Sequence, residues 1–154
     1  MFALPQVEYL GYIVSRDGIR ASPAKTRTVR NFPVPRNAKE VRSFLGLASF
    51  YRLLVPNFAQ IAKPMSELLH KEAPLVWSEC QQTTFENLKQ ILCSEQVLTY
   101  PNFDNHFILT IDASKVTVSA ILSQVQDGVE RPISFASCQM NPTEQCYSAS
   151  EAEI

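Results

Sequence analysis

Apolar residues recur at helical spacing in two long segments of the chain. In residues 37–55, "NAKEVRSFLGLASFYRLLV", one apolar stripe is made of Val41, Phe44, Leu45, Ala48 and Tyr51. In residues 79–92, the corresponding stripe is made of Phe85, Leu88, Ile91 and Leu92. Spacing of three and four residues is typical of amphipathic helices. Asn37 with Glu40, and Ser78 with Gln81, provide capping residues at the two starts, so the pattern predicts two helices.

Two shorter helices are expected around the first of these. Ser22-Pro23 is a favourable helix start, with serine as N-cap and proline at the first helical position, and this helix should end near Asn31. The prolines of "FPVPR" then favour an extended linker. After Pro56, Asn57 can begin another helix, which Pro64 is predicted to break or restart.

Strand patterns occupy both ends of the chain. Residues 7–14, "VEYLGYIV", suggest one strand that contains Gly11, followed by the turn "SRDG" and a short return at 19–20. Later strands are expected at 107–112, 117–125 and 130–136, the last two joined by a hairpin turn at Asp127-Gly128. Ser148 and Glu151 predict the start of a closing helix. The expected fold class is therefore α+β.

Composition narrows the class of protein. Of the 154 residues, 45% are hydrophobic, enough for a core. No apolar run reaches the roughly 18 residues of a membrane span, and the start lacks the features of a secretory signal. Because the four cysteines form no CxxC pair and the histidines form no ligand pattern, zinc binding is disfavoured. We expect a reduced, intracellular protein.

The net charge of −1 conceals a strong asymmetry. Residues 16–71 hold 11 Lys and Arg against 3 Asp and Glu, a balance of +8, whereas the rest of the chain carries −9. Such asymmetry suggests a polyanion partner for the basic half. A solvated basic face with no ligand explains the charge equally well.

Arg42, Gly46 and Phe50 are spaced by four residues, so they form a row along one side of the predicted helix. Glycine inside a helix costs about 1 kcal/mol relative to alanine, which makes sense if another surface approaches the backbone there. A nucleic-acid minor groove is one such surface. A closely packed neighbouring helix is the other, and the residues alone favour it.

Asp112 ends the strand at 107–112. It can cap the strand end through an Asx-type hydrogen bond, or it can ligate a hard cation such as Mg²⁺. Metal-dependent cleavage of a phosphodiester needs several converging carboxylates. Glu153, in the first turns of the closing helix, is the strongest candidate for a second one, although acids in a first turn commonly serve only the helix dipole.

Taken in order, these segments resemble the Pol polyprotein of gypsy-type LTR retrotransposons. Residues 7–69, "VEYLGYIVSRDG…PMSELL", are similar to the end of the palm and the thumb of a reverse transcriptase. The stretches "LVWSECQQTTFENLKQIL…HFILTIDAS" and "AILSQVQDGVERPISFASCQMNPTEQCYSASEAEI" resemble the start of its RNase H domain. The resemblance implies three parts: 1–21 as palm end with primer-grip hairpin, 22–76 as helical thumb, and 77–154 as an incomplete RNase H-like domain with a mixed sheet.

The resemblance also implies roles for particular residues. Leu10, Gly11 and Tyr12 match the primer grip, and the row Arg42, Gly46 and Phe50 matches the thumb contacts with the template–primer minor groove. Asp112 and Glu153 match the first two of four carboxylates that bind Mg²⁺ in RNase H. The implied partners are an RNA–DNA hybrid or template–primer duplex and the remainder of the polyprotein, with no membrane.

Two departures from the family bear on activity. Ser119 stands where the family usually has glycine, which could crowd the metal site. The double-aspartate polymerase motif and the other two RNase H carboxylates would fall outside this sequence. Some retroviral enzymes also carry a connection domain of this fold without catalytic acids, but Asp112 and Glu153 favour an RNase H origin.

The expectation is therefore a fragment of a retrotransposon reverse transcriptase with RNase H. Its parent activities would be RNA-directed DNA polymerisation and Mg²⁺-dependent hydrolysis of RNA in hybrids, in the cytoplasm or a virus-like particle. The chain alone is expected to be catalytically weak or inactive. The alternatives are a non-catalytic nucleic-acid-binding module and an inert retroelement relic.

Overall fold

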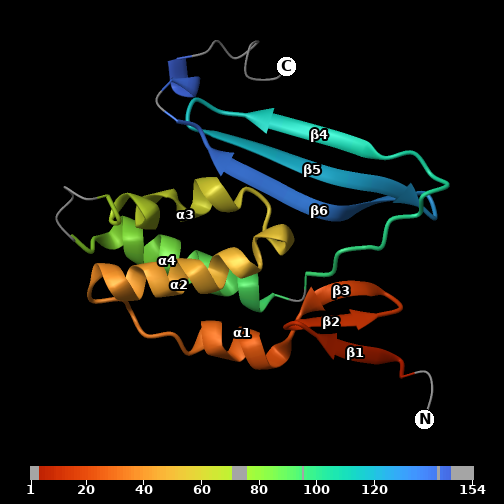
Figure 1. Cartoon of the computed structure of the whole chain (residues 1–154), viewed down its shortest axis with the longest axis horizontal. Helices are drawn as coiled ribbons and strands as arrows, with labels where there is room; N and C mark the ends of the chain where they lie inside the picture. The colour runs from red at the N-terminus through yellow and green to blue at the C-terminus, as the bar shows by residue number, and fades with distance from the viewer. Residues whose placement is uncertain (1–3, 71–75, 95, 142, 147–154) are drawn as a thin grey trace.

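The computed structural model describes residues 4–70, 76–94, 96–141 and 143–146. Its elements, in chain order, are β1 (Gln6–Tyr9), β2 (Tyr12–Ser15), β3 (Gly18–Ala21), α1 (Pro23–Arg30), α2 (Ala38–Phe50), η1 (Arg52–Leu54), α3 (Phe58–Glu67), α4 (Glu79–Cys93), β4 (Ile108–Ala113), β5 (Thr117–Gln126), β6 (Val129–Gln139) and η2 (Glu144–Cys146). Figure 1 shows the α-helices packed together, with the sheet β4–β6 on one side and the smaller sheet β1–β3 at one end. Among the described residues, none of the helices has the length and apolar character needed to cross a membrane.

The smaller sheet begins with a hairpin rather than with one long strand. β1 and β2 pair antiparallel from Gln6↔Ser15 to Tyr9↔Tyr12. The prediction of a continuous strand at 7–14 is therefore wrong, because the chain reverses at Leu10-Gly11, where φ is 49° and 83°. Two successive residues with positive φ match the twist of a two-residue hairpin, and glycine adopts such angles without steric cost.

The predicted helix starts are confirmed at Ser22, Asn37, Asn57 and Ser78. At α2, the Asn37 Oδ1 accepts a hydrogen bond from the Glu40 amide at 2.9 Å. The Glu40 carboxylate accepts one in return from the Arg36 amide at 2.7 Å. The regular α-helix then ends at Phe50, five residues earlier than its predicted end at residue 55, and η1 follows.

Pro64 lies inside α3, so the predicted break at this residue is wrong. A proline inside a helix removes one amide donor and ordinarily kinks or ends the helix. Here Ala62 and Met65, on either side of Pro64, are buried in the core. Burial of this face favours the continuous helix over a break.

The helices share one apolar core. The stripes of α2 and α4 meet in it, with the Phe44 and Phe85 ring centroids 4.6 Å apart. Val29 of α1 and Met65 of α3 belong to the same cluster and are fully buried. Since α4 begins after residue 76, this core extends across the predicted boundary between 22–76 and 77–154, and that division remains a prediction.

The larger sheet has the order β4-β5-β6, which confirms the three predicted strands, and Asp127-Gly128 forms the hairpin turn between β5 and β6. All its described strands are antiparallel, so the parallel part of a mixed sheet is not found among the described residues. One side faces α3: the Ser137 hydroxyl accepts a hydrogen bond from the Ala59 amide at 2.9 Å. The closing helix predicted from Ser148 lies outside the described residues.

The segment between α4 and β4 joins the two sheets. Leu98 exchanges two backbone hydrogen bonds with Ile19 of β3, at 2.8 and 2.9 Å. Further along, the fully buried Gln124 side chain accepts from the Asn102 amide at 2.9 Å and donates to the Asn102 carbonyl at 2.8 Å. The position of the small sheet beside α2 therefore depends on contacts far apart in sequence.

Candidate nucleic-acid interface

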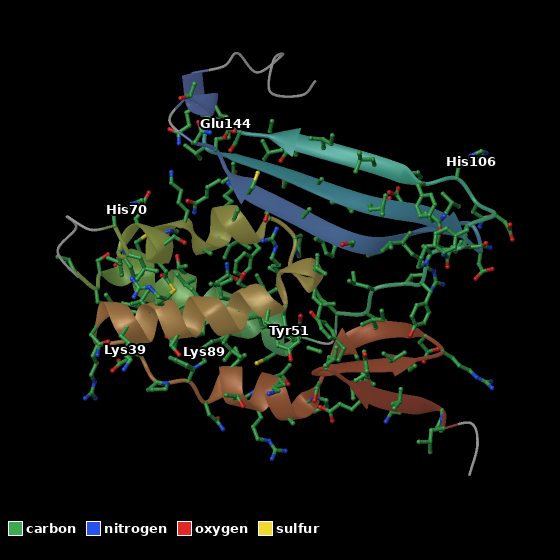
Figure 2. All side chains as sticks on the ribbon, viewed as in Figure 1. Lys39, Tyr51, His70, Lys89, His106 and Glu144 are labelled. Atoms are coloured by element: carbon green, nitrogen blue, oxygen red, sulfur yellow. The ribbon has the colours of Figure 1, made fainter. Side chains whose placement is uncertain are left out.

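A groove of about 970 Å³ lies where the β1–β2 turn, the second half of α2 and β6 meet. Five of the six residues predicted to bind nucleic acid line it: Leu10, Gly11, Tyr12, Gly46 and Phe50. Figure 2 labels Tyr51 at this junction, where the end of α2 approaches the small sheet. The fold thus brings together two predicted segments that lie more than 30 residues apart in the sequence.

Two tyrosine hydroxyls fix these segments to each other. The Tyr12 hydroxyl, from β2, donates to the Phe50 carbonyl at 2.8 Å. The Tyr51 hydroxyl donates in the opposite direction, to the Gly11 carbonyl at 2.9 Å. The rings of Tyr12 and Phe50 also stack with centroids 5.5 Å apart, and those of Tyr12 and Tyr51 meet edge-on at 5.3 Å. These contacts hold the β1–β2 turn against the end of α2.

Both hydroxyls stay protonated well above neutral pH. Burial, together with the smaller effects of the neighbouring Tyr12 and Glu8, raises the pKa of Tyr51 to about 12. Burial also raises the pKa of Tyr12 above its ordinary value. Each tyrosine can therefore serve as a hydrogen-bond donor throughout the physiological range of pH.

The row Arg42, Gly46 and Phe50 is exposed along α2, and half of the Phe50 surface (51%) is accessible. Apart from its two chain neighbours and the nearby backbone of α2, a Cβ atom added at Gly46 would meet no described atom within 4 Å. Close packing of a neighbouring helix therefore does not account for this glycine. Arg42 does not line the groove and lies one helical turn before Gly46.

Sequence reasoning missed several residues of the groove. Tyr51 was assigned only to the core stripe, although it forms one of the two hydrogen bonds that position the turn. Lys25 of α1 also lines the groove, and its Cγ lies 3.7 Å from the position that a Cβ atom would take at Gly11. Ile133 and Ser134 of β6 complete one wall. No local pattern could have indicated these residues, because only the tertiary fold brings β6 and α2 to the same groove.

Asp112 lies in a different region, near the end of β4, and is exposed. Its residue partner on β5 is Ser119, whose hydroxyl donates to the Asp112 backbone carbonyl at 3.3 Å. The carboxylate is a hard oxygen donor of the type that Mg²⁺ accepts. However, no group of three or more His, Cys, Asp or Glu side chains suited to a metal ion occurs within the described part of the chain. Glu153 lies outside the described residues, so the roles of both acids remain predictions.

Sequence similarity to curated transposon proteins extends over nearly the whole chain. The chain is 39% identical to the retrovirus-related Pol polyprotein from transposon opus of Drosophila melanogaster, over 97% of its residues. It is 41% identical to the corresponding polyprotein from transposon gypsy of the same organism, over 99% of its residues. The chain spans 16% of the length of each of these relatives.

Solved structures of viral enzymes share the fold. One is the foamy viral protease–reverse transcriptase in complex with an RNA/DNA hybrid, at a TM-score of 0.81 and 25% identity. Another is the same type of enzyme in complex with dsDNA, at a TM-score of 0.80 and 25% identity. The match covers 96% of this chain in both cases, and 20% and 31% of the respective viral chains.

A family match accounts for the second half of the chain. Residues 77–154 fit the pattern of the RNase H-like domain found in reverse transcriptase. Together with the transposon relatives, this match confirms the resemblance to gypsy-type Pol polyproteins that the sequence motifs indicated. The chain belongs to the family of RNase H-like domains found in reverse transcriptases.

Proposed function

We propose that this chain grips a template–primer duplex or RNA–DNA hybrid. The primer strand would lie against the groove at Leu10, Gly11 and Tyr12, and the minor groove would lie over the row on α2. The observation that carries this proposal is the pair of tyrosine hydrogen bonds, which holds the turn beside an exposed helix row. The viral enzymes with this fold were solved with dsDNA and with an RNA/DNA hybrid, which supports the same class of ligand here.

The chemistry of the row suits a nucleic-acid backbone. The open surface at Gly46 lets a duplex approach the helix closely, and the exposed Phe50 ring offers an apolar surface to sugars or bases. Arg42 and Lys25 provide positive charges for phosphates. Because residues 16–71 carry a balance of +8, binding should release counterions from the phosphates, and the affinity should fall steeply as the salt concentration rises.

The proposal is tested by fluorescence anisotropy with a labelled RNA–DNA hybrid at several salt concentrations. Arg42→Ala should weaken binding and reduce the slope of log affinity against log salt by about 1. The control is Arg131→Ala, which removes an exposed positive charge from β6 outside the groove. Absence of hybrid binding at low salt, or equal effects of the two variants, would contradict the proposal.

We propose a second function for longer polyproteins that carry this sequence: Mg²⁺-dependent hydrolysis of RNA in hybrids, with Asp112 and Glu153 as two of the metal ligands. The family match of residues 77–154 supports it. Bound Mg²⁺ would polarise the phosphate and activate water. In such a polyprotein, Asp112→Asn should abolish cleavage and leave hybrid binding unchanged. Cleavage that survives this substitution would contradict the assignment.

A further inference from the structure

A second, smaller concavity of about 280 Å³ shares no lining residue with the groove. Three arginines line it: Arg20 from β3, and Arg27 and Arg30 from α1. Thr26 and Ser94 contribute hydroxyl groups, which donate to the Pro23 and Ile91 carbonyls at 3.2 and 2.6 Å. Among the described residues, no aspartate or glutamate lines the space. We refer to Arg20, Arg27, Arg30, Thr26 and Ser94 as the arginine pocket.

Packing beneath the arginine pocket keeps its walls in place. Val29, between the two helical arginines, is fully buried in the core. The Cys93 thiol, at the end of α4, donates to the Thr26 carbonyl at 3.4 Å. Nearby, the Lys89 ammonium donates to the Phe32 carbonyl, just beyond α1, at 3.0 Å. The backbone that carries Arg27 and Arg30 is therefore held against α4.

The three positive charges lack acidic partners among the described residues. The ion pair found there joins Lys63 to Glu67, on α3. Arg20 donates only to the neutral Gln6 side chain, at 3.3 Å. Arg27 and Arg30 lie in the last turn of α1, where the helix dipole favours cations. That dipole does not account for Arg20, which comes from a strand and lines the same space while its guanidinium donates to Gln6.

We propose that the arginine pocket binds one phosphodiester group of a nucleic-acid strand, as an anchor distinct from the groove. Guanidinium groups donate paired hydrogen bonds to phosphate oxygens, and a bound anion would relieve the repulsion among three like charges. The pocket is sized for a phosphate with its sugar rather than for a duplex. The inference rests on the proposed function only in its choice of nucleic acid as the source of the phosphate.

The test uses the double variant Arg27→Gln/Arg30→Gln, which changes two exposed side chains and leaves the core intact. Hybrid binding is measured between 50 and 200 mM salt, and the slope of log affinity against log salt should become less negative by about 1 to 2. Arg131→Gln is the control, with an unchanged slope expected. In a second measurement, inorganic phosphate should raise the melting temperature above that in chloride at equal ionic strength, and the double variant should lose this rise.

The two measurements separate the outcomes. If the double variant keeps both the salt slope and the phosphate effect of the parent chain, the arginine pocket is overturned. A weakening of hybrid binding by Arg42→Ala would still leave the proposed function standing in that case. A phosphate effect that depends on the arginines, with unchanged hybrid slopes, would overturn the nucleic-acid ligand in favour of free phosphate. Failure of the parent chain to bind any hybrid would overturn the proposed function and the nucleic-acid source together, and the phosphate measurement would still report whether the pocket holds an anion.

Discussion

Gly46→Ala should make the protein more stable and, at the same time, a weaker binder. Gly46 lies in the interior of the 13-residue α2, where alanine is favoured over glycine by about 0.8–1.0 kcal/mol. The new Cβ would meet nothing within 4 Å, and the backbone at this residue does not have positive φ. Neither clash nor strain offsets the gain. The free energy of unfolding should therefore rise by about 1 kcal/mol, which for a domain of this size raises the melting temperature by about 2–4 °C.

The same methyl group would stand on the exposed row between Arg42 and Phe50, where we propose that the duplex approaches. Hybrid affinity should therefore fall several-fold although the fold is more stable. Urea denaturation measures the first effect, and anisotropy with the labelled hybrid measures the second. Gly128→Ala is the matched control: its Cβ would also enter open space, but φ is +76° at this turn, so alanine there should destabilise the chain without weakening binding by the folded protein.

Either half of this prediction can fail separately. If Gly46→Ala is less stable than the parent chain, the fold itself must require glycine at this residue. That result would contradict the open surface around Gly46. Unchanged or tighter hybrid binding by a stabilised Gly46→Ala protein would refute close approach of the duplex to α2. The proposed grip would then have to rely on the turn at Leu10-Gly11 and on charge.

Three further changes have defined expectations. Tyr51→Phe removes a donor to the Gly11 carbonyl, which still accepts from the Ser22 amide at 2.9 Å, so urea denaturation should show a loss of about 1 kcal/mol. The pKa of Tyr51 is raised from 10.0 to about 12 in the folded protein, so the unfolded chain releases this proton first as pH rises. The free energy of unfolding should therefore decline between pH 10 and about pH 12. Tyr51→Phe should reduce this decline. Gln124→Met removes the hydrogen bonds that this fully buried side chain makes with the Asn102 amide and carbonyl, and should cost about 1–3 kcal/mol in the same denaturation assay. The third change is Asp112→Asn. The 154-residue chain by itself should cleave the RNA of a hybrid in Mg²⁺ no faster than background, because metal-pair hydrolysis needs several converging carboxylates. Cleavage by this chain that is lost in Asp112→Asn would contradict this expectation.

Local signals were sufficient for the helix starts and the later strands. The capping pair Asn37 and Glu40 forms the expected hydrogen bond, and the buried face of α2 is the predicted stripe. These features depend on residues within one or two turns of each other, so they can be predicted from the local sequence. The Asp127-Gly128 hairpin is of the same kind, because its residue types match the positive φ angles that the turn requires.

Features that depend on distant contacts were predicted poorly. Leu10 is an unusual residue for a hairpin turn with positive φ, and "VEYLGYIV" therefore looked like one strand. Pro64 looked like a helix break because the buried neighbours that hold α3 together come from tertiary packing. The family resemblance named both the turn and the α2 row as site residues, but no sequence pattern indicated that Tyr12 and Tyr51 would join them.

The adjacent residues Phe50 and Tyr51 show how the fold and the proposed site depend on one helix end. Successive residues of a helix point about 100° apart, so one can face the core while the next faces solvent. Tyr51 is 1% exposed and fixes the turn, whereas Phe50 is 51% exposed and lies open in the groove. The Phe50 carbonyl, in turn, accepts the hydrogen bond that anchors Tyr12. The shape of the groove is thus set by core packing and backbone atoms, and the exposed side chain of Phe50 remains available for a ligand.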